Sequence, residues 1–430
     1  MHIRHVACST MHTAYNPPTM PISTLPRGAV RPRDRQDVLR DTRNRKMARS
    51  AHAYVRGNTV RFYEWLDSLA VHTLPEGPAI WICGDCHVGN LGPIGNAEGD
   101  IEVQIRDMDQ TVIGNPAHDL IRLGLSLATA ARGSDLPGVT TARMIEALME
   151  GYIHALGAST ASRRKRLDKP DTVHVVMRQA VKRSWKHLAR ERIENTRPTI
   201  PLGKRFWPLR ADERRALARL FEDEAMRHLV THLRSRDDNA QVELLDCAYW
   251  VKGCSSLGRL RYAALLGVQG GNGDADLYCM IDVKEAVQAA APRYPRARMP
   301  RDNGQRVVEG ARHLAPFLGE RMVATRFLNH GVFVRELLPQ DLKLEIDTLK
   351  QSEAMRVAYF LAETVGKAHA RQMDKDTARA WQQELKRQRS KTLAAPFWLW
   401  TSIVELMSSH ERGYLEHCRL YALGALESQS

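Results

Sequence analysis

Residues 80–123, IWICGDCHVGNLGPIGNAEGDIEVQIRDMDQTVIGNPAHDLIRL, place two acidic clusters about one hairpin apart. The first cluster, GDCHVGN at 84–90, directly follows the apolar run 79–82. The second, DMD at 107–109, follows residues 101–105, which alternate apolar and polar side chains as a half-buried strand does. A turn rich in Gly, Pro and Asn separates them at 92–100. The pattern therefore predicts carboxylates fixed at strand ends or on short loops.

These residue types at this spacing suit phosphoryl transfer. Asp85 would take or orient the proton of an attacking hydroxyl, and His87 is expected to be a structural member of the same catalytic loop rather than a second base. The amide oxygen of Asn90 and the carboxylate of Asp107 would hold Mg²⁺ against nucleotide phosphates, with Asp109 as a further ligand. A β-hairpin with polar turns and a buried histidine stays open as the structural alternative.

Two motifs resemble a known class of enzymes. The segment GDxHxxN at 84–90 resembles the catalytic loop of aminoglycoside-phosphotransferase-type kinases, and DMDQTVIGNPAHDL at 107–120 is similar to their metal-binding segment. The resemblance implies that Asp85 is the catalytic base and that Asn90 and Asp107 are metal ligands. It also implies that Asp119 pins the catalytic loop from the next helix. Cys83 stands where those kinases usually have histidine, which puts any bracing of the loop by that histidine in doubt.

The composition is that of a soluble globular protein large enough for two or more lobes, with 43% hydrophobic and 26% charged residues among 430. No run of about 18 apolar residues predicts a membrane span, and no secretory signal is recognisable at the N-terminus. Seven scattered cysteines indicate a reduced, cytoplasmic protein. The CxxC at 83–86 lacks the second cysteine pair of a zinc site, so redox or zinc chemistry is not favoured. A net charge of +14 favours anionic partners.

The sequence pattern in the second half of the chain predicts a loop and strands that cover nucleotide phosphates. Strand patterns at 242–251, 259–266 and 277–286 flank a Gly/Ser loop and a turn at 267–276, and the third ends in Val-Lys. Small residues let backbone N–H groups approach phosphates, and a lysine can reach in from the neighbouring strand. This arrangement resembles the small lobe of a kinase, although the spacing departs from GxGxxG. The residues implied in nucleotide binding are Gly253, Ser255, Ser256, Gly258 and Lys284.

Two further roles follow from the same resemblance. Glu309, on a helix expected from 306, would hold Lys284 in place. The strand at 332–339 ends like a kinase hinge, where backbone groups around Glu336 to Leu338 would bind adenine.

The remaining chain divides by composition. Residues 1–45 predict a flexible basic arm, 46–160 the catalytic and metal-binding part of a large lobe, and 161–240 a basic helical segment with a long helix at 211–233. Residues 241–346 form the expected small lobe, and 347–430 the helices that complete the large lobe. Arg56-Gly57 could place a cation near phosphates, but a helix junction with a salt bridge is the simpler interpretation.

The order of these parts is inverted relative to ordinary kinases, because the catalytic and metal loops precede the glycine loop. The sequence therefore predicts an α+β, two-lobed, protein-kinase-like fold that is circularly permuted and carries a helical insertion. The combination of KMxxS…RG at 46–57 with GDxHxxN, DxD…DLxRL, GxxSxG…VKEA and RVV…VRxL resembles the uncharacterised bacterial domain-of-unknown-function family numbered 2252, over residues 30–425. That resemblance implies no substrate.

The leading functional hypothesis is an ATP- and Mg²⁺-dependent phosphotransferase acting on an unknown small-molecule or protein acceptor. Adenylyl transfer by the same parts is a close alternative. A different class of function stays open as well: a nucleotide-sensing pseudokinase, or a basic scaffold that binds nucleic acid through 160–195. Strongly salt-dependent nucleic-acid binding without ATP turnover would favour the scaffold.

Overall fold

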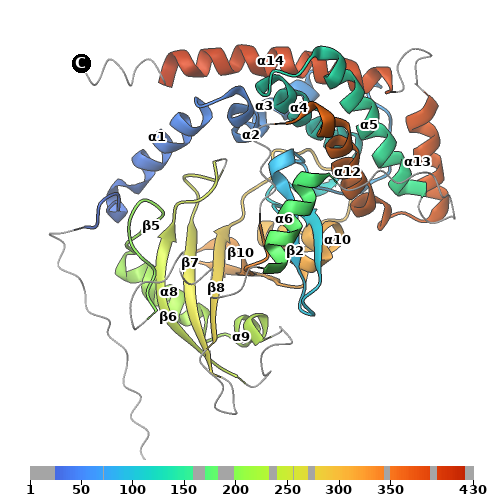
Figure 1. The fold of residues 1–430 in the computed structure, drawn as a ribbon. Coiled ribbons are helices and arrows are strands. Elements are labelled where there is room, and N and C mark those ends of the chain that lie inside the picture. Colours follow the sequence, from blue (N-terminus) through green and yellow to red (C-terminus); the bar gives the residue numbers. More distant parts are fainter. Residues whose placement is uncertain are drawn as a thin grey trace, which may run out of the picture.

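A computed structural model describes residues 25–70, 72–157, 170–182, 198–231, 240–254, 256–269, 277–342, 349–387 and 395–421. Several expectations lie outside these residues: those for most of the N-terminal arm, for Ser255, for the tip of the turn at 267–276 and for most of the basic segment 160–195. The described chain forms a mixed α+β structure, with a sheet in one half and helices α4, α5, α12, α13 and α14 gathered in the other (Figure 1).

The sheet has six antiparallel strands in the order β5-β6-β7-β8-β10-β9. Their bounds are Phe206–Trp207, Gln241–Trp250, Arg261–Gln269, Leu277–Glu285, His330–Leu337 and Met322–Phe327 respectively. The three strands expected between 242 and 286 are confirmed as the meander β6-β7-β8, and the strand expected at 332–339 as β10, which forms a hairpin with β9. Lys284, near the end of β8, lies opposite Arg261 on β7 and Phe333 on β10.

The two faces of the sheet have different coverings. Alternation along the strands places Tyr249, Tyr262, Ile281 and Val334 in one buried cluster, which includes residues of α8 (Ala211–Leu220) and α9 (Glu224–Thr231). The single long helix expected at 211–233 is therefore wrong, because the chain turns between 221 and 223. On the other face, Ala263, Leu265 and Met280 pack in a second cluster with Ile200 and Phe206.

The segment with the two acidic clusters forms two small antiparallel ribbons. β1 (Ile80–Ile82) pairs with β4 (Val112–Gly114), and β2 (Leu91–Gly95) pairs with β3 (Ile101–Ile105). The first acidic cluster lies between β1 and β2, with a 3-10 turn at Val88–Asn90, and the second lies between β3 and β4. The pairing of β2 with β3 therefore brings the two loops to the same end of the ribbon.

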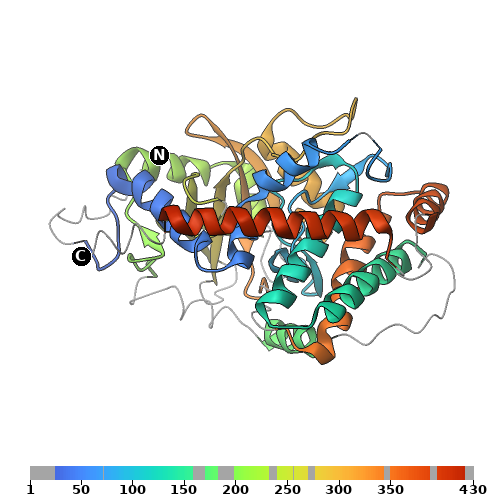
Figure 2. The same cartoon turned by 90° about the horizontal axis from the view of Figure 1, so that it is seen from above.

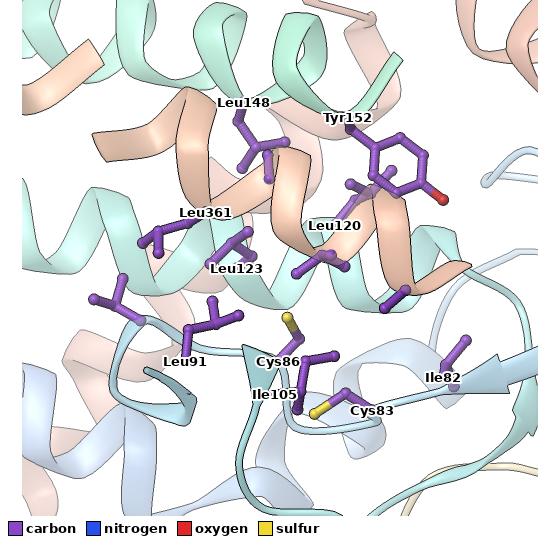
Figure 3. Close-up of a cluster of buried hydrophobic side chains, with 14 of the residues drawn as sticks. Ile82, Cys83, Cys86, Leu91, Ile105, Leu120, Leu123, Leu148, Tyr152 and Leu361 are labelled. Carbon is purple, nitrogen blue, oxygen red and sulfur yellow. The ribbon is translucent and has the colours of Figure 1, made fainter. Parts of the chain in front are cut away.

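The helical half is built around α4 (Ala117–Gly133), which directly follows β4. It packs with α5 (Gly138–Gly157) and α12 (Gln351–Ala370), and its apolar residues Leu120 and Leu123 lie in one core beneath the first acidic loop (Figure 3). The helices α13 (Lys375–Arg387) and α14 (Phe397–Tyr421) complete this half. Seen from above, α14 runs along the molecule past α1 and α2 (Figure 2). The remaining described helices are α6 (Asp171–Lys182), α10 (Asn303–Leu314) and α11 (Pro316–Gly319).

The N-terminal region is more ordered than the sequence predicts. A 3-10 turn at Pro32–Asp34 leads into α1 (Arg35–Met47), followed by α2 (Ala51–Gly57) and α3 (Thr59–Asp67). The flexible arm expected over 1–45 is therefore wrong for 35–45. The reason is tertiary packing: Leu39 is buried against the sheet, and the buried guanidinium of Arg35 lies 2.8 Å from Glu213 on α8. Among the described helices, none has the length and hydropathy needed to span a bilayer.

Candidate functional site

The first acidic loop is fixed by Asp119, in the first turn of α4. Its two carboxylate oxygens accept the backbone N–H groups of Cys83 (2.8 Å) and Gly84 (2.9 Å). Gly84 has φ +74°, and a side chain here would collide with the carbonyl oxygen of Gln110. The carboxylate of Asp119 is fully buried, so these bonds replace its hydration. The expected role of Asp119 in pinning the loop is confirmed.

A histidine braces the same loop from the far end of the chain. His369, near the end of α12, places Nε2 3.2 Å from the Asp119 carboxylate, while its Nδ1 lies 2.9 Å from the hydroxyl of Tyr152 on α5. That hydroxyl accepts the indole N–H of Trp381 at 3.1 Å. Because Asp119 is the acceptor, Nε2 carries the proton, Nδ1 accepts from Tyr152, and every group in the chain is satisfied. The loss of histidine at position 83 therefore leaves the loop braced by another element.

Asp85, the predicted base, is held by Arg122. Its Oδ1 accepts from Arg122 on α4 (Nη2, 2.8 Å; Nε, 2.9 Å), whereas Oδ2 lies 3.9 Å from Nε2 of His87. Arg122 is fully buried and also donates to the carbonyl of Val55 on α2 at 2.7 Å. Burial raises the pKa of Asp85 above its ordinary value, and the positive charge of Arg122 opposes that rise without cancelling it. Arg122 is the arginine of the DLxRL motif, but the sequence pattern assigns it no role.

Asn90 is oriented by the two acidic loops. Its side-chain N–H₂ donates to the carbonyl of Asp107 at 2.9 Å and to that of Asp85 at 3.4 Å. Since both partners are carbonyl oxygens, the amide nitrogen faces them and the amide oxygen is left as the free acceptor. This orientation suits Asn90 for the metal-ligand role that the sequence predicts.

Lys284 joins the sheet to the second acidic loop. Its Nζ lies 2.6 Å from Asp109 and 3.3 Å from both oxygens of Asp107, which is 177 positions away in the chain. The lysine is buried, whereas half of the Asp107 side chain is exposed. Burial acts to raise the pKa of Asp107, but the charges of Lys284, Arg335 and Arg261 outweigh it and hold the pKa below its ordinary range. Burial and the charge of Asp107 raise the pKa of Asp109.

Glu309 does not hold Lys284. Although it lies on α10, as expected, it faces Arg312 (3.4 Å) and His313 (3.7 Å). Another residue of the same helix reaches the second acidic loop: Arg306 donates to the carbonyls of Asp109 (3.1 Å) and Thr111. The expectation for Glu309 is wrong because Lys284 pairs with Asp107 and Asp109, while the partly exposed Glu309 side chain pairs with residues of its own helix.

The two glycines of the Gly/Ser loop at 251–260 adopt a backbone conformation that favours glycine. Gly253 and Gly258 both have positive φ, +91° and +97°. The hydroxyl of Ser256 donates to the carbonyl of Lys252 at 3.3 Å, so it stabilises the loop itself. Arg259, at the end of the loop, lies 3.4 Å from Asp109. The end of the loop therefore faces the second acidic cluster.

The end of β10 does not offer free hydrogen-bonding groups for adenine. The N–H and C=O of Glu336 are both bonded to Arg321, at 3.4 and 2.8 Å. Those of Leu338 are bonded to Asp341, at 3.2 and 3.1 Å. The predicted adenine-binding role of Glu336 and Leu338 is therefore wrong for this conformation, because the chain turns back at Asp341 and satisfies its own backbone.

The sheet face beside Lys284 carries a charge cluster that the sequence reading missed. Asp282, two residues before Lys284 on β8, is fully buried between Arg261 (2.6 Å) and Arg335 (3.0 Å). These guanidinium groups hold the pKa of Asp282 low against the effect of burial. Because side chains alternate along a strand, the sequence alone predicts that Asp282 and Lys284 lie on the same face of the sheet. The cluster leaves an excess of positive charge facing the acidic loops.

The acidic loops carry oxygen donors of the types that magnesium takes. Among the described residues, no group of three His, Cys, Asp or Glu side chains is arranged to hold a metal. Mg²⁺, however, usually takes one or two carboxylates and fills its other positions with water and substrate phosphates. The half-exposed carboxylate of Asp107 and the free amide oxygen of Asn90 supply such a set.

The chain belongs to the family DUF2252, described as an uncharacterized protein conserved in bacteria, whose model matches residues 35–420. The family resemblance drawn from the motifs is therefore confirmed. Comparison with curated proteins and with solved structures found no match.

Proposed function

We propose that the protein is a kinase-like phosphotransferase that uses ATP and Mg²⁺. The observation that carries this proposal is the contact of Lys284 with Asp107 and Asp109. The sequence predicted a phosphate-binding lysine and a metal-binding acidic loop in separate halves of the chain, and folding brings them within 3.3 Å. Asp109 is shared by Lys284 and Arg259, whereas the Asp107 side chain is half exposed, so the Asp107 carboxylate is the one that a cation could reach.

Each residue has a role in this mechanism. Asp85, held at one oxygen by Arg122, would accept the proton of the acceptor hydroxyl with the other oxygen, and its raised pKa favours proton transfer near neutral pH. Asn90 and Asp107 would hold the magnesium ion, which when bound supplies charge neutralisation at the transferred phosphoryl group. Lys284 and the backbone of the 251–260 loop would position the nucleotide phosphates.

The arrangement of elements supports a permuted kinase-like fold as part of this proposal. A meander of three strands (β6-β7-β8), then a helix (α10) and a hairpin (β9-β10), form the sheet half, and the catalytic loops precede them in the chain. The helices α8 and α9 on the outer face of the sheet would be the insertion.

The test combines nucleotide binding with product analysis. Titration calorimetry with ATP should show Mg²⁺-dependent binding in the wild type and its loss in Asp107→Ala. Asp85→Ala should bind ATP but lose turnover by about 10²–10⁴-fold, the usual contribution of a general base. Asp376→Ala, an exposed carboxylate on α13, is the matched control and should change neither.

The products then separate the two transfer reactions. ADP as product supports phosphoryl transfer, whereas AMP or pyrophosphate indicates adenylyl transfer by the same parts. If the wild type binds no ATP, or if Asp107→Ala binds it as well as Asp376→Ala does, the proposal fails.

A further inference from the structure

Arg56 lies where three functional elements meet. It is the penultimate residue of α2, and its guanidinium packs against Gly89 in the first acidic loop, where an added Cβ would lie 3.0 Å from Cζ. The next residue, Gly57, approaches the 251–260 loop, since a Cβ there would lie 3.1 Å from Sγ of Cys254. The α2 helix thus presents a cation between the catalytic loop and the glycine-containing loop.

Within the described part of the chain, Arg56 has no carboxylate partner. Its Nε is buried and makes no hydrogen bond to any described residue. Three buried arginines are paired with an acid: Arg35 with Glu213, Arg122 with Asp85, and Arg321 with Asp341. The buried Arg306 donates to backbone carbonyls instead, whereas Nε of the partly buried Arg56 has neither kind of partner among the described residues. A guanidinium held in place without a counter-ion is the typical state of an anion site before its ligand binds. The salt bridge expected for Arg56 from the sequence is absent among these residues.

His87 supplies a second unpartnered donor. The residue is only 9% exposed, and its Nδ1 is buried without a hydrogen-bond partner among the described residues. Burial lowers the pKa of His87, and the charges of Arg56 and Arg122 lower it further, so the imidazole is neutral. A neutral ring can still donate one N–H to a bound anion.

Further positive charge surrounds the same place. Burial raises the pKa of the Cys254 thiol, while the charges of Lys46, Arg43, Arg56 and Arg49 oppose the rise. Lys46 also donates to the carbonyl of Gly253 at 2.9 Å, which ties α1 to the glycine-containing loop. Several cations close to one another suit a group that carries two negative charges better than a single carboxylate.

We propose that Arg56 and His87 bind a phosphoryl group of a substrate, between the catalytic loop and the 251–260 loop. The proposal rests on the proposed phosphotransferase function for the source of that group. The source is either the terminal phosphate of the nucleotide or a phosphate that the acceptor already carries. In both cases α1 and α2 belong to the substrate site, rather than to the outside of the fold.

The first experiment titrates inorganic phosphate into the full chain by calorimetry, without nucleotide. The wild type should bind it, Arg56→Gln should bind at least 10-fold more weakly, and Arg56→Lys should fall between them because it keeps the charge and loses the planar fork. Arg387→Gln removes an exposed arginine of α13 and should bind as the wild type does. Thermal melting checks that each variant is folded.

Gly89→Ala is a second variant that leaves Arg56 in the sequence. Its added methyl group would push the guanidinium aside, so phosphate binding should weaken, though less than in Arg56→Gln. Phosphate binding that is absent in the wild type, or equal in Arg56→Gln and Arg387→Gln, overturns the proposal. Arg56-dependent phosphate binding in a protein that binds no ATP would instead contradict only the proposed kinase function.

The source of the phosphoryl group is then decided by competition. Phosphate is titrated in the presence of saturating Mg·ADP and, separately, of a non-hydrolysable Mg·ATP analogue. If the analogue blocks binding and ADP does not, Arg56 binds the terminal phosphate of the nucleotide. If neither blocks it, Arg56 binds a phosphate on the acceptor, and phosphorylated hydroxyl compounds become the substrates to screen.

Discussion

Nε2 of His369 lies 3.2 Å from the carboxylate of Asp119, although the two residues are 250 positions apart in the chain. Through Asp119 this histidine is connected to the backbone of the catalytic loop, and through its other nitrogen to Tyr152. The loop is therefore held in place by residues of α4, α5 and α12 together. Its geometry depends on the packing of the whole helical half.

Replacing Tyr152 by phenylalanine should loosen this support. The change leaves Nδ1 of His369 without a donor and the indole N–H of Trp381 without an acceptor, both fully buried. Unsatisfied buried groups cost about 1–3 kcal/mol each, so the free energy of unfolding should fall by about that amount or more. Urea denaturation measures it. An unchanged midpoint would show that the chain of hydrogen bonds does not contribute.

Glycine at position 84 should be indispensable for steric reasons as well as for its φ. Gly84→Ala combines a positive φ with a collision against the carbonyl of Gln110. Gly99→Ala provides the control, since its φ is +93° but no atom lies within 4 Å of the added carbon. Gly99→Ala should cost about 1 kcal/mol of stability and Gly84→Ala several times more. Thermal unfolding of both variants measures the difference, and equal losses would contradict the collision.

Arg122 should set the pH dependence of the proposed reaction. Its positive charge favours the ionised form of Asp85, so Arg122→Gln should raise the pKa of Asp85 further. Because a base must be deprotonated to act, the acidic limb of the rate profile should move to higher pH. Rates measured from pH 5 to 9 give the shift. A profile that only drops in height, with its limb unmoved, would limit Arg122 to a structural role.

Two histidines, the buried His410 and the partly buried His118, should make the fold sensitive to mild acid. Burial lowers the pKa of His118 to about 4 and that of His410 to about 3, from an ordinary value near 6.5. Below pH 6.5 these histidines are protonated in the unfolded chain but stay neutral in the folded protein. The free energy of unfolding therefore falls as the pH decreases, by at most about 1.4 kcal/mol per pH unit for each histidine. The free energy of unfolding stops falling only when the pH is below the pKa values of the two histidines in the folded protein.

Urea denaturation between pH 7.5 and 5 covers that window. His118→Gln and His410→Gln should each flatten the decline relative to the wild type. An exposed histidine changed in the same way, His72→Gln, should leave the slope as it is. Identical slopes in all four proteins would contradict the assignment.

The strands and the acidic loops could be predicted because their signals are local. Alternation over 101–105 and 277–285 fixed the faces of β3 and β8, and the position of Asp119 after the second acidic cluster indicated its role. Arg122 and Arg306 could not be assigned, since each acts on a loop that only tertiary folding brings near. The role given to Leu338 was wrong because no pattern shows that Asp341 folds back onto it.

Helix α14, at the end of the described chain, is hydrogen-bonded to the C-terminal end of α1, near the beginning of that chain. On α14, the hydroxyl of Tyr414 donates to the carbonyl of Ala48 at 3.1 Å, and the ring of His417 bonds the carbonyl of Asn44 at 2.9 Å. During synthesis, the residues around Arg56 and Asp85 leave the ribosome first, but their supports on β8, α12 and α14 arrive last. A nascent chain, or one truncated before α14, would therefore hold an unassembled site.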